Sequence, residues 1–186
     1  MSLDRLWAGW RQAFVSGERA DDHAGGSTAV DVADAVRAAG GDPDCVFCRI
    51  ASGGLPDTET HVVWRDPGGR AVAVLNAYPY TSGHLMVMPV RHVGELEDLD
   101  AEEALSVMSG VRQAIVALKA AYSPGGLNLG ANLGRAAGAG VPAHVHIHAL
   151  PRWHGDTNFM TSVADARVLP EAISVSAERL RAAWPR

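Results

Sequence analysis

The chain has 186 residues, of which 47% are hydrophobic and 20% charged, so a folded domain with an apolar core is expected rather than a disordered chain. A formal net charge of −5 argues against non-specific binding to nucleic acid, but it does not exclude an anionic small ligand held by local amides and cations. No apolar run approaches the roughly 20 residues of a membrane span, and the first residues, MSLDRLWAGW, lack an apolar signal core. A cytoplasmic protein is therefore expected.

Residues 1–44 are predicted to form an N-terminal arm and a flexible linker. The segment LDRLWAGWRQAFV has apolar residues at helical spacing, and the stretch from Ser16 to Asp44 is rich in Gly, Ala and Asp. A candidate helix lies within the linker, around Thr28–Ala39. Residues 45–155 are predicted to form the main domain, and residues 156–186 a C-terminal extension with a helix.

The main domain is predicted to be built on an antiparallel sheet. HVVWRD and RAVAVLN flank the turn signal DPGG, which predicts a β-hairpin, and HLMVMPV, LNLGANLG and HVHIHALP supply three further strands. Between the third and fourth strands, DLDAEEALSVMSGVRQAIVALKAAY has helical periodicity, with Asp100 as a plausible N-cap and SPGG as the stop. PEAISVSAERLRAAW predicts a C-terminal helix. Five short strands with one long helix indicate an α+β domain.

Both cysteines stand in one motif, CVFC, as Cys45 and Cys48. This spacing is typical of a metal half-site or of a redox pair. A redox pair is expected to open a helix within a thioredoxin-like pattern, whereas here Gly53 and Gly54 interrupt soon after the motif. A metal half-site is therefore favoured.

Three of the eight histidines, His144, His146 and His148, alternate with apolar residues. On a regular strand they line one face over about 13 Å, so all three are poorly placed to share a zinc ion, whose nitrogen ligands lie about 2.0–2.1 Å from the metal. The three are not expected to have one role. A solvated polar face and a catalytic zinc site built on His-x-His are the alternatives, although two cysteines and two histidines complete a tetrahedron and leave no open position.

The motif HVHIHALP resembles the histidine triad pattern, and CVFCRI, LNAYPYTSGHLMVMPVRHV and an Asn-containing glycine-rich loop occur in the order typical of that family. The region from about Cys45 to Trp153 is thus identified as a member of the histidine triad (HIT) family. RLW, PYTSGHLMV and PRWHGDTNFM resemble its actinobacterial branch, related to diadenosine tetraphosphate phosphorylases. The resemblance implies a five-stranded antiparallel sheet with one long helix, and a chain that forms a homodimer.

The resemblance also implies a role for each motif residue. His146 is implied as the nucleophile that attacks the α-phosphorus of a nucleotide, giving a nucleotidyl-histidine that water or phosphate then cleaves. His148 and His84 are implied as phosphate-side donors. The positions implied in nucleotide binding are Asn76, Asn132, Gly138, Gly140, Phe47 and Trp153, with Ile50 and Leu75 as further candidates for the base pocket. The implied ligands of a structural zinc are Cys45, Cys48, His92 and His144.

The expected function is that of a nucleotide phosphoesterase or nucleotidyltransferase acting on nucleoside or dinucleoside polyphosphates. A non-enzymatic nucleotide sensor and a zinc-dependent hydrolase are the alternatives. Gly140 stands where many family members carry Gln or Ser, four residues before the first triad histidine, so water and phosphate both remain open as the acceptor.

Overall fold

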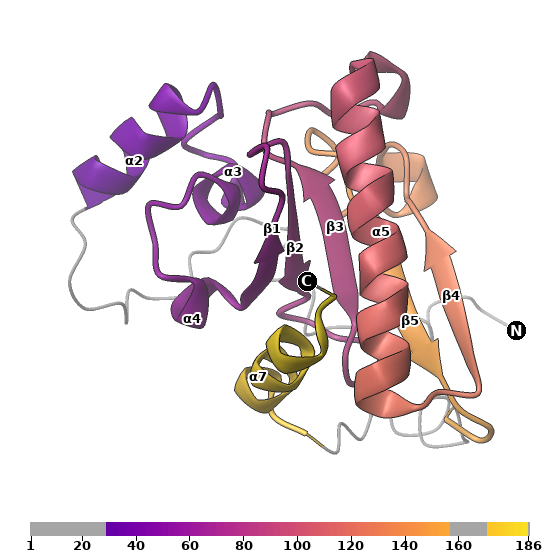
Figure 1. Ribbon diagram of the computed structural model, residues 1–186. Helices are drawn as coiled ribbons and strands as arrows, with labels where there is room; N and C mark the ends of the chain where they lie inside the picture. Colours follow the sequence, from indigo (N-terminus) through magenta and orange to yellow (C-terminus); the bar gives the residue numbers. More distant parts are fainter. Residues whose placement is uncertain (1–28, 157–170, 186) are drawn as a thin grey trace, which may run out of the picture.

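The computed structural model describes residues 29–156 and 171–185; the predicted N-terminal arm helix lies outside these residues. Five strands form one antiparallel sheet in the order β1-β2-β3-β5-β4 (Figure 1). Their bounds are Val62–Arg65 for β1, Ala71–Leu75 for β2, Leu85–Pro89 for β3, Gly126–Gly130 for β4 and Ile147–Arg152 for β5. The predicted antiparallel sheet and its β1–β2 hairpin are confirmed.

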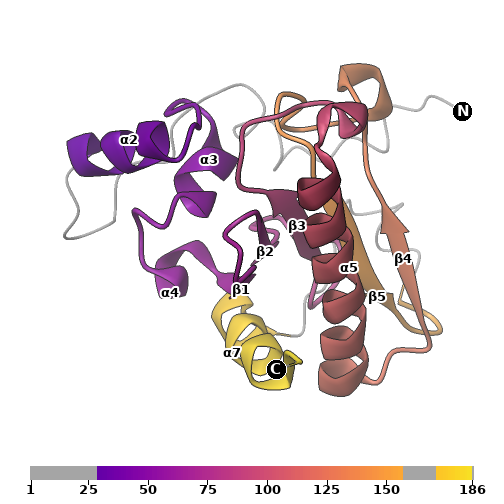
Figure 2. The ribbon, with the colours of Figure 1, turned by 45° about the horizontal axis from the view of Figure 1, so that its top comes forward.

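The sheet has a core on each face. Along β2, Ala71, Ala73 and Leu75 belong to one apolar cluster, and Val72 and Val74 belong to the other. Because successive strand residues point to opposite faces, each cluster covers one side of the sheet. The long helix α5 (Ala101–Tyr122) and α7 (Ile173–Ala183) pack on the first face, and residues of α2 (Ala29–Ala38) and α3 (Val46–Ala51) belong to the second cluster (Figure 2).

The ends of α5 follow the predicted signals. The Asp100 side chain accepts from the Glu103 amide, and the Glu103 side chain accepts from the Asp100 amide, which completes a capping box. Ser123, the first residue of SPGG, adopts a left-handed conformation and ends the helix. By length and composition α5 is apolar enough to cross a membrane, but it packs along β2, β3 and β5 as the core helix of this domain.

The smaller elements complete the domain. The candidate helix in the linker forms as α2, and the predicted C-terminal helix forms as α7. The Arg181 guanidinium of α7 donates to the carbonyl oxygens of Val62 and Asp57, which joins α7 to β1 and to the short helix α4 (Asp57–Thr60). Two 3-10 turns lie in the connections: η3 (Leu96–Asp98) between β3 and α5, and η4 (Arg135–Ala137) between β4 and β5.

The histidine strand is shorter than predicted. Strand β5 begins only at Ile147, so His144 and His146 lie on the bent segment that enters it. The amide of Val145 donates to the carbonyl oxygen of Val93 at 2.7 Å, which holds this segment against the chain that follows β3. The three histidines therefore do not form one regular row, and the first one turns away from the other two.

Candidate active site

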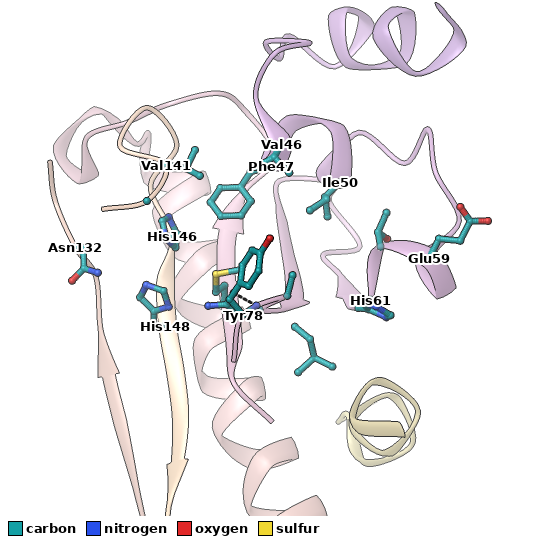
Figure 3. Close-up of a pocket in the computed structure, with 16 residues that line it drawn as sticks. Val46, Phe47, Ile50, Glu59, His61, Tyr78, Asn132, Val141, His146 and His148 are labelled. Atoms are coloured by element: carbon teal, nitrogen blue, oxygen red, sulfur yellow. Dashed lines mark hydrogen bonds between the residues drawn. The ribbon is translucent and has the colours of Figure 1, made fainter. Parts of the chain in front are cut away.

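A cavity of about 360 Å³ lies between α3, the β2–β3 region and the histidine segment (Figure 3). This volume falls in the range of small-molecule sites. His146 and His148 lie at one end of the cavity, Glu59 and His61 lie at the other, and Tyr78 lies between them. The lining residues are Val46, Phe47, Ile50, Glu59, Thr60, His61, Leu75, Asn76, Ala77, Tyr78, Met86, Asn132, Gly140, Val141, His146 and His148.

The wall between the two ends is mostly apolar. Phe47 and Ile50 on α3 and Leu75 on β2, the three candidates for a base pocket, all line it. Met86 also lines it, because it pairs in register with His148 across β3 and β5 and points to the same face. An apolar slot with polar groups at its ends suits a flat aromatic ring that carries a charged tail.

The His146 ring is held in one tautomer. Its Nδ1–H donates to the backbone carbonyl of His144 at 2.9 Å, so the lone pair of the neutral ring lies on Nε2. The edge of Phe47 packs against the ring with the centroids 4.8 Å apart. Only 6% of His146 is exposed. The ring is therefore oriented from both sides, with its nucleophilic nitrogen defined.

A chain of hydrogen bonds orients His148. The amide N–H of Tyr80 donates to Nδ1 of His84 at 3.1 Å, so the proton of the neutral His84 ring lies on Nε2. That Nε2–H donates to Nδ1 of His148 at 2.9 Å. By the same logic His148 carries its proton on Nε2 and can donate from there. His84 is fully buried and is absent from the cavity wall, so it lies behind His148 rather than beside a ligand.

The other predicted nucleotide-binding residues divide into two groups. Asn76, Asn132 and Gly140 line the cavity, and Oδ1 of Asn76 accepts from the amide of Tyr78 at 2.9 Å. Gly138 and Trp153 are not among the lining residues. Gly138 ends η4 with a φ of 88°. The Trp153 ring packs edge-on against the ring of Tyr122, with the ring centroids 6.2 Å apart.

The four predicted metal ligands converge beside this cavity. One ligand atom from each of Cys45, Cys48, His92 and His144 lies within 4.8 Å of all the others. Nδ1 of His144 lies 3.6 Å from Sγ of Cys45 and 3.5 Å from Sγ of Cys48. A sulfur and a nitrogen bound to one tetrahedral zinc are separated by about 3.5 Å, given bond lengths of about 2.3 and 2.0–2.1 Å. The spacing therefore fits a zinc ion.

The protonation of these groups suits a metal as well. Nε2–H of His144 donates to the carbonyl of Pro89 at 2.9 Å, which leaves Nδ1 as the ligand atom, and burial lowers the pKa of His144 to about 4. Burial also raises the pKa of the Cys48 thiol to about 11 without an ion. A buried thiol of this kind ionises when a cation binds it.

The CVFC motif lies at the start of a helix, contrary to the expectation from the sequence. Cys45 is the N-cap of α3, so the CVFC motif does open a helix, and Gly53 and Gly54 follow only after that helix has ended. The helix position alone does not separate a redox pair from a metal half-site. His92 and His144 separate them, because they bring two nitrogen ligands to the two sulfurs, both of which are free thiols.

Several lining residues carried no sequence signal. His61 is the first residue of the predicted strand HVVWRD, which carries no binding motif, and Glu59 and Thr60 belong to a helix of only four residues. Tyr78 lies within the motif LNAYPY, from which only Asn76 and Leu75 are expected at the site. These residues enter the cavity through the packing of α4 against β1 and of the β2–β3 loop against the histidines.

Comparisons with known proteins agree with this geometry. The sequence model of the HIT domain matches residues 56–155. An AP-4-A phosphorylase of Mycobacterium tuberculosis (strain CDC 1551 / Oshkosh) is 43% identical over 132 residues, which span 71% of this chain and 67% of that protein. The domain match begins after α3, so the predicted domain start at residue 45 remains a prediction.

Two solved structures share the fold. A zinc-bound histidine triad family protein from Mycobacterium smegmatis has a TM-score of 0.58 and 33% identity, covering 75% of this chain and 91% of that one. A hypothetical histidine triad nucleotide-binding protein from Sulfolobus tokodaii has a TM-score of 0.60 and 28% identity, with the same coverage. The sheet order, the triad segment and these matches together lead to one conclusion: the chain belongs to the HIT domain family.

Proposed function

We propose that this protein is a nucleotide-processing enzyme that cleaves a nucleoside or dinucleoside polyphosphate through a covalent nucleotidyl-histidine on His146. The observation that carries the proposal is the His146 ring, which borders a cavity of nucleotide size with Nδ1 tied to a carbonyl and its lone pair on Nε2. The 43% identical relative described as an AP-4-A phosphorylase supports a dinucleoside polyphosphate as the substrate.

In the first step, Nε2 of His146 attacks the α-phosphorus. A P–N bond forms, the bond from that phosphorus to the bridging oxygen breaks, and the rest of the polyphosphate leaves with the bonding electron pair. The ring keeps its Nδ1 proton on the His144 carbonyl, so the developing positive charge of the imidazole is stabilised as it forms. The Nε2–H of His148 is the proposed donor to a non-bridging oxygen of the α-phosphate.

In the second step, an acceptor oxygen attacks the same phosphorus and the P–N bond breaks, which returns the electron pair to Nε2. Inorganic phosphate carries an ionised oxygen and attacks without first losing a proton, whereas water must lose one. Gly140 lines the cavity with no side chain, at the place where many family members carry Gln or Ser. We propose phosphate as the acceptor, in line with the relative's description as a phosphorylase.

We further propose that Cys45, Cys48, His92 and His144 hold a structural zinc ion. When bound, zinc supplies four bonds that join α3 to the segment before β5. A zinc-bound structural relative supports this assignment, as does the spacing of the four ligand atoms. The zinc-hydrolase alternative is disfavoured, because four protein ligands leave no open position for water and His146 is not in the cluster.

We propose that two chains form a homodimer, because the surface exposes a strand edge and several large apolar side chains. Among the strands that the structure describes, β4 pairs only with β5, and such an edge in a sheet protein can pair with a further strand. Large apolar side chains are exposed nearby, namely Leu105, Met108 and Val116 on α5 and Leu129 on β4. Analytical ultracentrifugation is expected to give a particle of two chains; a single chain at micromolar concentration contradicts the proposal.

Product analysis tests the activity. The purified protein is incubated with diadenosine tetraphosphate, with and without inorganic phosphate, and the products are separated by ion-exchange chromatography. Phosphate as acceptor is expected to give ADP and ATP, whereas water gives AMP and ATP. A nucleotide sensor binds the substrate but releases no product in either condition, which contradicts the proposed activity.

A further inference from the structure

The two cysteines are placed for a disulfide as well as for a metal ion. Cys45 and Cys48 lie on the first turn of α3, where the carbonyl of Cys45 accepts from the amide of Arg49 at 3.1 Å. Cα atoms three residues apart on such a turn are separated by about 5 Å, within the range of about 4.4–6.8 Å that a disulfide spans. Both thiols are free, and their sulfurs lie within 4.8 Å of each other. The chain contains no other cysteine, so each sulfur has only the other as a partner within the chain.

The two sulfurs are buried to different degrees. Cys45 is 6% exposed and Cys48 is 2% exposed. Gly41, which follows α2, covers Cys48 closely, because a Cβ at Gly41 would lie 3.2 Å from the sulfur of Cys48. His92 is the half-buried member of the four-residue cluster, so the cluster borders solvent there. A small oxidant therefore meets Cys45 first, and Cys48 lies behind it.

A disulfide between these sulfurs is incompatible with the proposed zinc site. Two thiolates bound to one tetrahedral zinc ion lie about 3.8 Å apart, whereas the sulfurs of a disulfide lie about 2.0 Å apart. The metal ligand is the thiolate, and a disulfide contains none. Zinc and the disulfide therefore compete for the same two cysteines, and the turn that carries them tightens when the disulfide forms.

Two contacts connect this turn to the proposed nucleophile. Phe47 lies between the cysteines in the sequence, and its ring centroid is 4.8 Å from that of His146 (Figure 3). The ring of His144 lies 3.6 and 3.5 Å from the sulfurs of Cys45 and Cys48, and its carbonyl accepts from Nδ1 of His146 at 2.9 Å. Tightening the turn displaces Phe47, and loss of the metal frees the ring of His144. Both residues that orient His146 are therefore affected by oxidation of the pair.

We propose that Cys45 and Cys48 form a redox switch, in which hydrogen peroxide converts them to a disulfide, displaces the proposed zinc ion and slows the reaction of His146. The inference rests on the proposed function and concerns the regulation of the same site. First, the thiolate of Cys45 attacks peroxide, the O–O bond breaks, hydroxide leaves, and Cys45 becomes a sulfenic acid. The thiolate of Cys48 then attacks that sulfur, a second hydroxide leaves, and the S–S bond forms. Two electrons pass from the sulfurs to peroxide, and the metal leaves as a divalent cation.

The test follows three quantities in the reduced, zinc-loaded protein during treatment with hydrogen peroxide. Free thiols are counted by alkylation and intact mass, and released zinc is measured with a chromogenic chelator. Labelling of His146 by diadenosine tetraphosphate is followed by mass spectrometry. Because the chain has two cysteines, the thiol count reports on this pair alone. The double variant Cys45→Ser/Cys48→Ser forms no disulfide, and its treated and untreated samples are compared as the control.

We expect both thiols to be lost together, with one zinc ion released per disulfide. Labelling of His146 is expected to fall at least about tenfold, since a displacement of about 1 Å at a reacting group costs up to about 100-fold. Dithiothreitol with added zinc is expected to restore all three quantities; it does not reduce methionine sulfoxide, so recovery assigns the effect to the cysteines even if the double variant does not fold.

Three results overturn the inference: cysteines that gain oxygen without forming a disulfide, a disulfide that leaves the labelling of His146 unchanged, and an equal loss of labelling in the treated double variant. If the untreated wild type shows no labelling of His146, the proposed function has failed instead. The thiol count and the zinc release then still test whether the two cysteines form the disulfide at the expense of the metal.

Discussion

The backbone carbonyl of His144 accepts the Nδ1 proton of His146 at 2.9 Å, while the ring of His144 presents its own Nδ1 to the sulfurs of Cys45 and Cys48. One residue thus contributes its ring to the cluster of proposed metal ligands and its backbone carbonyl to the orientation of the proposed nucleophile. Phe47, between the two cysteines in the sequence, packs against both histidine rings. Its ring centroid lies 5.7 Å from that of His144 and 4.8 Å from that of His146. His144 and Phe47 therefore connect the Cys/His cluster directly to the cavity.

Removal of one sulfur tests the metal assignment. Cys45→Ser is expected to lower the zinc content below one ion per chain and to lower Tm by several degrees, because structural zinc contributes folding free energy. Zinc is measured by inductively coupled plasma mass spectrometry and Tm by calorimetry. Ser52→Ala, a half-buried position at the end of the same helix, is the control and is expected to keep its zinc. A full zinc content in Cys45→Ser contradicts the assignment.

His84 is expected to act by positioning His148. His84→Leu removes the Nε2–H donor that sets the tautomer of His148, and we expect kcat to fall about 10- to 100-fold with little change in KM, the usual cost of a lost supporting hydrogen bond at a site. His84→Gln places an amide N–H near the same point and is expected to recover part of kcat. Equal kcat values for the wild type and His84→Leu exclude this role.

The Arg91–Glu103 pair is expected to make stability depend on pH in the acid range. The hydrogen bonds from Arg91, at 2.7 Å each, are the largest cause that lowers the pKa of Glu103 below its usual 4.5. Because the folded pKa is the lower one, this stabilisation is present above about pH 4.5 and is lost as the pH falls through the folded pKa. Glu103→Gln is expected to unfold about 1–2 kcal/mol more easily at pH 7, since it weakens both the ion pair and the capping box.

Urea unfolding between pH 3 and 7 measures this effect, and Glu102→Gln on the same helical turn is the control. Glu102 is exposed and pairs only with the exposed Arg70 among the described residues, so a small effect is expected there. If the free energy of unfolding of Glu103→Gln depends on pH between 3 and 7 as steeply as that of the wild type, the Arg91–Glu103 pair is not a source of the pH dependence.

Gly110 is expected to be required by packing rather than by backbone conformation. A Cβ at this position of α5 lies 2.8 Å from Cζ3 of Trp64 and 2.9 Å from Cγ1 of Val87. Gly110→Ala gains helix propensity of about 1 kcal/mol but overpacks the core, which costs about 1–3 kcal/mol. We expect a net loss of stability and a change in tryptophan fluorescence, with Ser109→Ala as the control. A more stable Gly110→Ala protein contradicts the close contact.

Sequence periodicity was sufficient for most of the fold. Alternating apolar residues predicted the strands, and the signals at Asp100 and SPGG predicted both ends of α5, because capping and strand alternation are local effects. The start of β5 was missed, since the bend at His144 depends on the hydrogen bond between Val145 and the distant Val93. Such a contact leaves no local pattern in the sequence.

The candidate site was predictable where a motif was present. The triad and CVFC pointed to residues that the structure brings together, whereas His61 and Tyr78 line the cavity only because separate segments meet there. Trp153 was expected near the site and instead packs on Tyr122 outside the cavity wall. Tyr122 is more than thirty positions away from Trp153 in the sequence, so local sequence patterns do not predict this contact.

The site of nucleotide attachment shows whether His146 forms the covalent intermediate. The protein is mixed with diadenosine tetraphosphate without phosphate, quenched in base to preserve the P–N bond, and mapped by tandem mass spectrometry. We predict one AMP on His146, and none on a His146→Ala variant that keeps its zinc and its fold. Attachment at another residue, or turnover by His146→Ala at the wild-type rate, contradicts the assignment of His146 as the nucleophile.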